Sequence, residues 1–117
     1  RVESPSGVVR LRYSQKVYGR AMSAATAQKL DGYMKDVVKN GTGTKAQVDG
    51  LSIAGKTGSA ESSSNGQAVT HAWFVGYLDS EMAPYAVCVM VEEGGSGGSV
   101  AAPVAAKIFE YLGRMEP

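Results

Sequence analysis

The chain has almost none of the residues that build disulfides and metal centres. It contains one cysteine, Cys88, and one histidine, His71. A single cysteine excludes an internal disulfide, and one cysteine with one histidine cannot form a structural zinc site. Because Cys88 lies in an apolar run, a buried structural thiol is its expected role. We therefore expect neither a metal nor a cofactor.

Long apolar runs and clusters of like charge are also missing. The 12 basic and 11 acidic residues are spread along the chain and leave a net charge of +1. No basic run suggests nucleic acid or an anionic membrane as a partner. The longest apolar stretch, Tyr85 to Val91, is far too short to span a bilayer. No N-terminal segment resembles a signal peptide, so any export signal or membrane anchor is expected outside this chain.

Local patterns predict one small α+β domain in the 117 residues. Apolar residues at helical spacing predict a helix from Ser23 to Asn40, with Ser23 as its N-cap, and a second helix from about Val100 to Leu112. Strands are expected at 51–60, 72–78 and 85–91, a loop or hairpin tip at 61–66, and a turn at 79–84. Short links between three strands predict an antiparallel meander, flanked by the two helices. Residues 1–22 are a poorly defined lead-in, with a partial strand pattern at 8–13.

Two stretches match catalytic or phosphate-binding motifs formally, but the residues around them argue against those functions. Gly94 to Gly98 fits the G-x-S-x-G nucleophile elbow, but that fold places its histidine after the serine, and His71 precedes it. The same tract lacks the lysine ending of a phosphate-binding loop. A flexible loop is therefore expected there. Ser63-Ser64-Asn65 matches S-x-N formally, but it lies in a serine-rich stretch and is expected to be a solvated tip.

The pattern Gly55-Lys56-Thr57-Gly58-Ser59 falls on a predicted strand, where lysine and glycine are both unusual. Both are explained if a substrate lies along the strand edge. Gly58 would clear space for it, and Lys56 would supply a fixed cation near a reacting serine or a substrate carboxylate. Thr57 and Ser59 would offer hydroxyls to that carboxylate, and free strand amides could stabilise an oxyanion. The alternative is an edge strand that uses lysine against aggregation. The motif alone leaves both interpretations open.

The segments around this pattern carry one family signature. They are 54–61 (AGKTGSAE), 71–77 (HAWFVGY), the turn 41–43 (GTG) after the first helix, and 101–105 (AAPVA) after the glycine-rich tract. Together they closely resemble the end of the transpeptidase domain in class B penicillin-binding proteins. The resemblance covers about residues 23–112, and residues 1–22 match only loosely. It implies that residues 1–117 are the C-terminal segment of a larger β-lactamase/transpeptidase-like α/β/α domain.

The family uses the motifs S-x-x-K, S-x-N and K-T-G, in that order. The resemblance implies that Lys56 polarises the site and helps to orient the S-x-N serine. It implies that Thr57, Gly58 and Ser59 bind substrate, with the Ser59 amide as an oxyanion donor. The family cross-links peptidoglycan stem peptides through an acyl-serine, and β-lactams acylate the same serine. His71 and Trp73 also match the family pattern, and both are assigned packing roles.

No serine in this chain is followed by lysine three residues later. The resemblance therefore implies that a missing N-terminal part of the domain supplies the nucleophile and the S-x-N motif. It also implies a site of action at the extracytoplasmic face of the bacterial membrane. A penicillin-sensing receptor domain and a class D-like β-lactamase remain as alternatives within the family. Outside it, the alternative is a small α+β interaction module in which K-T-G is a coincidence.

Overall fold

A computed structural model of the protein describes residues 2–12, 14, 16–64, 66–81 and 85–115. Its strands are β1 (Val2–Glu3), β2 (Val9–Leu11), β3 (Ile53–Ser64), β4 (Gln67–Leu78) and β5 (Ala86–Val91). Its helices are α1 (Ala24–Asn40) and α2 (Ala102–Gly113), with a short 3-10 turn, η1 (Thr44–Ala46), and a π-helical turn, η2 (Gly97–Ala101).

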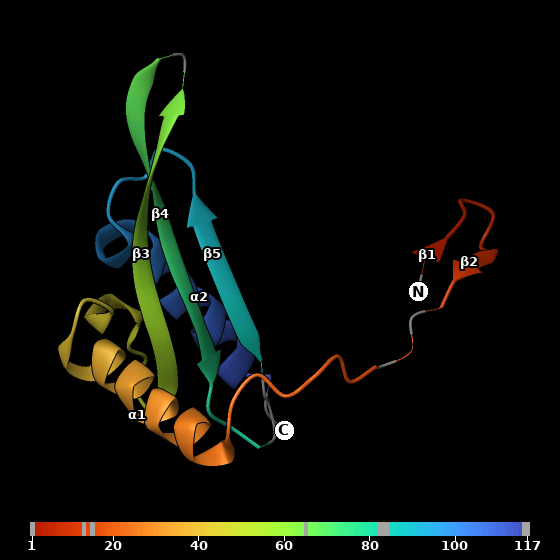
Figure 1. The fold of residues 1–117 in the computed structure, drawn as a ribbon, viewed down its shortest axis with the longest axis horizontal. Helices are drawn as coiled ribbons and strands as arrows, with labels where there is room; N and C mark the ends of the chain where they lie inside the picture. Colours follow the sequence, from red (N-terminus) through yellow and green to blue (C-terminus); the bar gives the residue numbers. More distant parts are fainter. Residues whose placement is uncertain (1, 13, 15, 65, 82–84, 116–117) are drawn as a thin grey trace.

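The three longer strands form one antiparallel sheet in the order β3-β4-β5. In this register Thr57 lies opposite Phe74, and Phe74 lies opposite Val89. Figure 1 shows α2 behind this sheet and α1 beside the first part of β3. The predicted meander and the α+β class are therefore confirmed.

Both helices lie close to their predicted positions. The Ser23 hydroxyl accepts a hydrogen bond from the Thr26 amide at 3.1 Å, so Ser23 is the N-cap of α1 as expected. At the other end, the Gly41 amide donates to the Val37 carbonyl at 3.1 Å. The second helix begins later than predicted, because Val100 lies in the π-helical turn η2 and α2 starts at Ala102.

Of the loop or hairpin tip predicted at 61–66, the hairpin is confirmed, but its tip is shorter than expected. The β3–β4 ladder continues without interruption to the pair Ser64↔Gln67, so both strands are longer than the sequence suggested. Gly66 has a φ of 77°, a conformation that glycine adopts without steric cost and that a tight hairpin turn needs. Asn65 lies outside the described residues, as do 82–84 of the predicted turn.

The core lies on one face of the sheet, under α2. Phe74 of β4 and Phe109 of α2 are both fully buried, and their rings meet edge to face with centroids 6.5 Å apart. A side chain at Gly55 or Gly76 would collide with the Phe74 ring. The two glycines therefore make room for the aromatic pair that joins the helix to the sheet.

The opposite face of the sheet is largely open in the described part of the chain. Val75 is 49% exposed, Met90 45% and Trp73 37%. Cys88 lies opposite Val75 on this face and is exposed as well. The prediction of a buried thiol was therefore wrong, because the apolar run around Cys88 alternates between a covered face and an open one.

The lead-in contains a small hairpin, β1–β2, which Figure 1 shows standing apart from the three-stranded sheet. It occupies part of the predicted strand pattern at 8–13, of which residue 13 lies outside the described residues. Between this hairpin and α1, Val17 is 87% exposed and Tyr18 is fully exposed.

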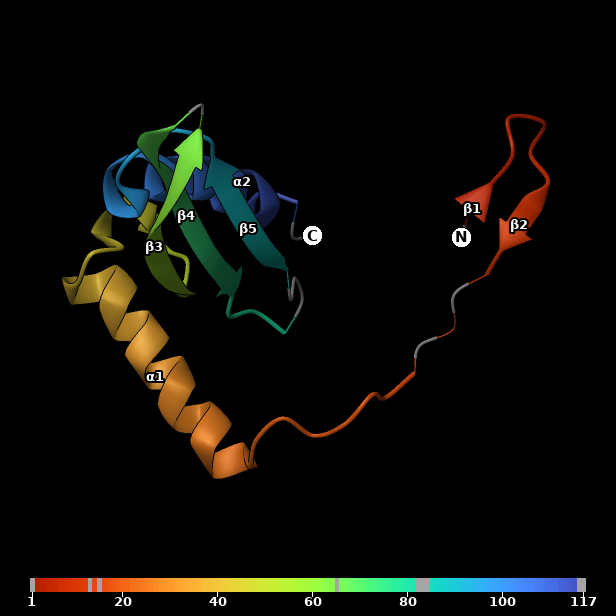
Figure 2. The ribbon, with the colours of Figure 1, turned by 45° about the horizontal axis from the view of Figure 1, so that its top comes forward.

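A polar cluster ties α1 to the end of β4. The Tyr77 hydroxyl donates to Asp31 at 2.6 Å, and Lys35 bridges Asp31 at 2.9 Å and Asp79 at 2.6 Å. The hydrogen bond from Tyr77, followed by that from Lys35, lowers the pKa of Asp31. Partial burial and the same bond to Asp31 raise the pKa of Tyr77 to about 12. Figure 2 shows α1 extending away from the sheet, so these contacts brace its N-terminal half.

Replacing Tyr77 by phenylalanine removes the donor to Asp31, and we expect the free energy of unfolding of the complete domain to fall by about 1 kcal/mol at neutral pH. Because the folded state lowers the pKa of Asp31, this contribution is present above the carboxyl's ordinary pKa of 3.8 and disappears as the pH falls through the lower folded value. Denaturant unfolding across this range measures it. Tyr33→Phe, at a position 69% exposed on α1, is the matched control. A Tyr77→Phe deficit that does not shrink in acid would contradict this role.

Candidate active site

Strand β3 carries the K-T-G residues on two different faces of the sheet. Thr57 pairs with the buried Phe74, and its side chain, 9% exposed, lies on the covered face. Ser59 lies on the same face, because side chains two residues apart share a face. Lys56 and Gly58 alternate with them and lie opposite Val75 and Trp73 on the open face.

One edge of β3 is free of strand partners in the described part of the chain, since β3 ends the sheet order. The Asp79 amide donates to the Ser52 carbonyl at 2.8 Å, which makes 52 and 79 a hydrogen-bonded pair. In an antiparallel ladder such pairs alternate, so even-numbered residues of β3 bond to β4 and odd-numbered residues point their amides outward. The amides of Thr57 and Ser59 therefore point to the free edge.

The Lys56 side chain is exposed and curls toward the free edge. Its Nζ donates to the Thr57 carbonyl at 2.5 Å. That oxygen is one of the outward-facing groups, so the ammonium sits at the edge along which an extended ligand could pair. Among the described residues, Lys56 makes no hydrogen bond to the hydroxyl of Thr57 or Ser59, because those hydroxyls leave the strand on the other face.

Both motif hydroxyls are held by neighbours from other elements. Thr57 Oγ1 and Thr42 Oγ1 are 2.6 Å apart, and either can donate. Ser59 Oγ accepts a hydrogen bond from the Gly97 amide at 3.3 Å. Thr42 follows α1, and Gly97 opens η2, so two separate segments of the chain meet at the K-T-G strand.

The glycine-rich tract is packed against the sheet, and the prediction of a flexible loop was wrong. Gly97 is buried, and a side chain there would collide with the carbonyl oxygens of Gly58 and Trp73. The Gly95 amide donates to the Thr70 carbonyl at 2.9 Å, which ties the tract to β4. The glycines therefore allow close backbone approach, and the tract reaches Ser59 as a consequence.

A cavity of about 380 Å³ opens beside these hydroxyls. We call it the hydroxyl pocket, and its lining residues are Gly41, Thr42, Thr44, Lys45, Thr57, Gly58, Ser59, Ser96, Gly98 and Ser99. Lys45 is the one charged residue in this lining, and no acidic residue belongs to it. Hydroxyl donors with a nearby ammonium suit an anion such as a carboxylate.

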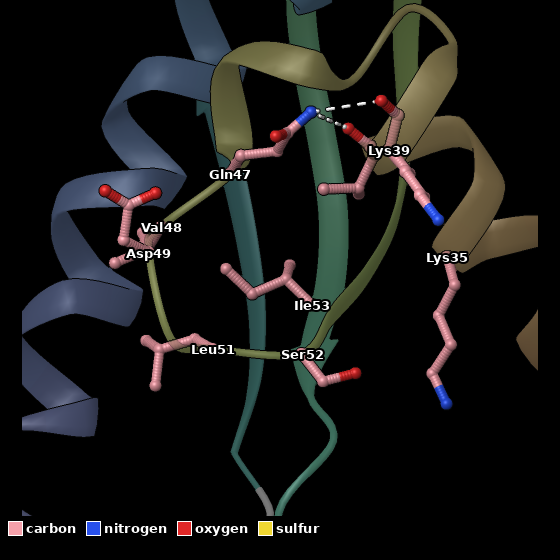
Figure 3. A pocket seen from close by; sticks show the side chains of 9 residues that line it. Lys35, Lys39, Gln47, Val48, Asp49, Leu51, Ser52 and Ile53 are labelled. Carbon is pink, nitrogen blue, oxygen red and sulfur yellow. Dashed lines mark hydrogen bonds between the residues drawn. The ribbon is translucent and has the colours of Figure 1, made fainter.

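A second cavity, of about 410 Å³, lies where β3 begins and includes none of the K-T-G residues. Figure 3 shows its lining side chains, with Gln47 reaching back to the end of α1. The Gln47 side chain donates to the carbonyls of Val38 at 2.8 Å and Lys39 at 3.1 Å. Gln47 thus satisfies carbonyls that the helix end leaves open, and we assign it a structural role.

The sequence alone did not identify three of these contacts. Thr42 and the Gly97 amide hold the motif hydroxyls, and outside the pocket the His71 Nδ1 accepts a hydrogen bond from the Glu93 amide at 3.1 Å. Glu93 has a φ of 53°, so this bond holds a turn in a conformation that glutamate rarely adopts. His71 therefore makes a polar contact, whereas the sequence suggested a packing role.

Among the described residues, no group of three histidine, cysteine, aspartate or glutamate side chains could hold a metal ion. Within the same residues, no helix is both long enough and apolar enough to cross a membrane.

Comparison with known proteins gives one consistent result. The family model described as "Penicillin binding protein transpeptidase domain" matches residues 6–110. The chain is 33% identical over 104 residues to the peptidoglycan D,D-transpeptidase PbpA of Mycobacterium tuberculosis, a match covering 84% of this chain. The solved D,D-transpeptidase domain of a peptidoglycan glycosyltransferase from Eggerthella lenta superposes with a TM-score of 0.68 at 31% identity, covering 96% of this chain and 26% of that one.

Penicillin-binding protein A of M. tuberculosis, solved as an imipenem acyl-enzyme complex, superposes with a TM-score of 0.63 at 32% identity, covering 94% of this chain and 24% of that one. The chain spans about a fifth of the length of the curated relatives it matches, 21% in the case of PbpA. The family model covers most of the sequence, and the K-T-G strand lies within the matched residues. The chain therefore belongs to the family of penicillin-binding protein transpeptidase domains.

Proposed function

We propose that this chain is the C-terminal segment of a peptidoglycan D,D-transpeptidase, in which residues 1–22 are a lead-in to the part at 23–112 that carries the motif resemblance. The protein would cross-link stem peptides through an acyl-serine intermediate and bind β-lactams at the same serine. Family membership and the similarity to PbpA support this assignment.

The observation that carries the proposal is the meeting of a free strand edge and the hydroxyl pocket. The outward amides of Thr57 and Ser59 would pair with an extended stem peptide lying along β3. The hydroxyls of Thr57 and Ser59, on the pocket side, would bind its terminal carboxylate. Gly58 carries no side chain, so the strand is uncluttered at this position. An added Cβ would have one neighbour within contact distance, the Cβ of Trp73 at 3.3 Å.

In this proposal, acyl transfer would take place along the edge of this strand. A serine hydroxyl from the S-x-x-K motif would attack the carbonyl carbon of the penultimate D-alanine, and the terminal D-alanine would leave. The Ser59 amide would donate to the oxyanion that forms, where a fixed donor is most effective. The Lys56 ammonium would raise the local positive potential on the open face. The amine of a second stem peptide would then attack the carbonyl carbon of the acyl-serine. This step would form the cross-linking amide bond and release the free serine.

The remaining catalytic groups would come from the N-terminal part of the same domain. The motif order places S-x-x-K and S-x-N before K-T-G, and this chain carries neither in a matching position. The open face of the sheet supports this arrangement, because Lys56 shares it with the exposed side chains of Val75 and Met90. A segment packed on that face would bring its side chains to the Lys56 ammonium.

The family implies action at the extracytoplasmic face of the bacterial membrane, with any anchor outside this chain. A penicillin-sensing receptor domain is the second candidate, because it would keep the same K-T-G strand without turnover. A pedestal domain in the protein favours the transpeptidase, and several membrane helices favour the sensor. Turnover separates them directly, since a transpeptidase releases D-alanine from stem peptides in the presence of an acceptor amine.

The first test is labelling by a fluorescent penicillin. We expect the complete protein to be labelled on the serine of an S-x-x-K motif, mapped by mass spectrometry of the digested adduct. We expect the isolated 117-residue chain to remain unlabelled, because it lacks that serine. Stable labelling of any serine within residues 1–117 would overturn the assignment.

Lys56→Ala in the complete protein should slow β-lactam acylation by about 10²-fold or more, the scale of removing one electrostatic contact from a closed site. Its folding should change little, because the Lys56 side chain is exposed and contributes little buried apolar area. Stopped-flow acylation and thermal unfolding measure the two effects. Lys107→Ala, at an exposed position on α2, is the matched control. Acylation within about twofold of wild type would make Lys56 a solvated edge residue.

Ser59→Ala should weaken binding of the substrate or β-lactam carboxylate by roughly 1 kcal/mol, the value of one lost hydrogen bond. The oxyanion donor is unaffected, because the substitution keeps the main-chain amide. The effect should therefore appear in the dissociation constant of the complex before acylation. Ser62→Ala, on an exposed position of the same strand, serves as the control. An equal loss in both variants would show that Ser59 has no special contact.

A further inference from the structure

We propose that Thr42 is a positioning residue of the transpeptidase site, which acts by donating its hydroxyl proton to Thr57 so that Thr57 can donate to a ligand carboxylate. The proposal rests on the function proposed above. It adds Thr42 to the proposed site and assigns the donor of the hydrogen bond between Thr42 and Thr57.

The contact itself is short and local to the hydroxyl pocket. Thr42 Oγ1 and Thr57 Oγ1 are 2.6 Å apart, and both side chains line the pocket. Thr57 is 9% exposed, and within the described part of the chain its hydroxyl hydrogen-bonds to that of Thr42 alone. Thr42 is thus the neighbour that decides how the Thr57 hydroxyl is oriented.

A hydroxyl group has one proton, so only one of the two threonines can donate to the other. If Thr57 donates to Thr42, the Thr57 oxygen presents only lone pairs to the pocket and repels a carboxylate. If Thr42 donates, the Thr57 proton is free to point into the pocket. A bound carboxylate therefore selects the order Thr42 to Thr57 to carboxylate, in which each bond polarises and strengthens the next.

The Ser59 hydroxyl is oriented in a comparable way by the Gly97 amide, which can act only as a donor. The Gly97 amide can only donate, so Ser59 Oγ is an acceptor in that bond and keeps its proton for the pocket. The two motif hydroxyls therefore both act as donors to the ligand when Thr42 donates. Lys45, the charged residue of the pocket lining, favours an anion in the same space.

The backbone of Thr42 is fixed independently of its hydroxyl. The amides of Gly41 and Gly43, on either side of it, both donate to the Val37 carbonyl, at 3.1 Å and 3.0 Å. A side chain at Gly98 would collide with the Thr42 carbonyl oxygen, so the glycine-rich tract also packs against this turn. Removing the hydroxyl should therefore leave the turn in place.

The test compares Thr42→Val, which keeps the side-chain shape, with Thr42→Ser, which keeps the hydroxyl, in the complete protein. We expect Thr42→Val to raise the dissociation constant of the pre-acylation complex with benzylpenicillin about fivefold, and to leave the acylation rate constant within about twofold. Thr42→Ser should restore wild-type binding. Thr26→Val makes the same chemical change outside the pocket, at an exposed threonine of α1 whose hydroxyl lies 2.9 Å from that of Ser23, and should match wild type.

A carboxylate-free ligand separates positioning from a general structural effect. The methyl ester of benzylpenicillin should bind wild type and Thr42→Val equally, because the ester carries no anion to select the order in which Thr42 donates to Thr57. Equal binding of the free acid by wild type and Thr42→Val would overturn the proposal. So would a fivefold loss that appears for acid and ester alike, or a loss that Thr42→Ser does not restore.

A titration with N-acetyl-D-alanine, monitored through the amide chemical shifts of Thr57 and Ser59, tests the role of Thr42 without any acylation. Wild type should bind this carboxylate about fivefold more tightly than Thr42→Val, with N-acetyl-D-alaninamide as the neutral control. If penicillin fails to acylate the wild-type protein, the proposed function fails, and this titration still confirms or overturns the role of Thr42. Equal binding in this titration would overturn that role even if the protein is acylated.

Discussion

The packing of Phe74 against Phe109 is the contact on which the rest of this structure depends. It joins α2 to the middle strand, and it decides which face of the sheet is covered. Because Phe74 lies opposite Thr57 in the β3–β4 register, it also decides on which face the Thr57 hydroxyl lies. The same contact explains why the motif segment begins with a glycine. A side chain at Gly55 would occupy the space of the Phe74 ring.

This register divides the motif between two environments. Odd-numbered residues of β3 send their side chains to the covered face and their amides to the free edge, so Ser59 can offer a hydroxyl and an oxyanion donor from one position. The even-numbered Lys56 sends its side chain to the open face. The Lys56 ammonium and the proposed carboxylate site therefore lie on opposite sides of one strand, and they would act on the same ligand only along the strand edge that both border.

Sequence reasoning was most successful where a pattern repeats locally. The period of the α1 stripe and the cap at Ser23 predicted that helix to within about a residue, and three apolar runs predicted the meander. It failed where the outcome depends on a distant partner. The exposure of Cys88 follows from which face α2 covers, and the packed glycine-rich tract follows from the close approach of Gly97 to β4. The sequence next to Cys88 does not reveal which face α2 covers, and the sequence next to Gly97 does not reveal its approach to β4. The K-T-G strand was predicted from its motif, whereas Thr42 came from a turn that carries no catalytic signature.

The two hydroxyls of the motif differ in how firmly their direction is set. A peptide amide such as that of Gly97 is always a donor, so the Ser59 hydroxyl is oriented before any ligand arrives. The partner of Thr57 is another hydroxyl, which can donate or accept, so that direction is set only when an anion enters. A pocket built this way pairs one prearranged donor with one that responds to charge. In the proposed role of Thr42, selectivity for a carboxylate over a neutral amide would reside mainly in Thr57, because a neutral ligand favours the donating order of the Thr42–Thr57 pair less strongly.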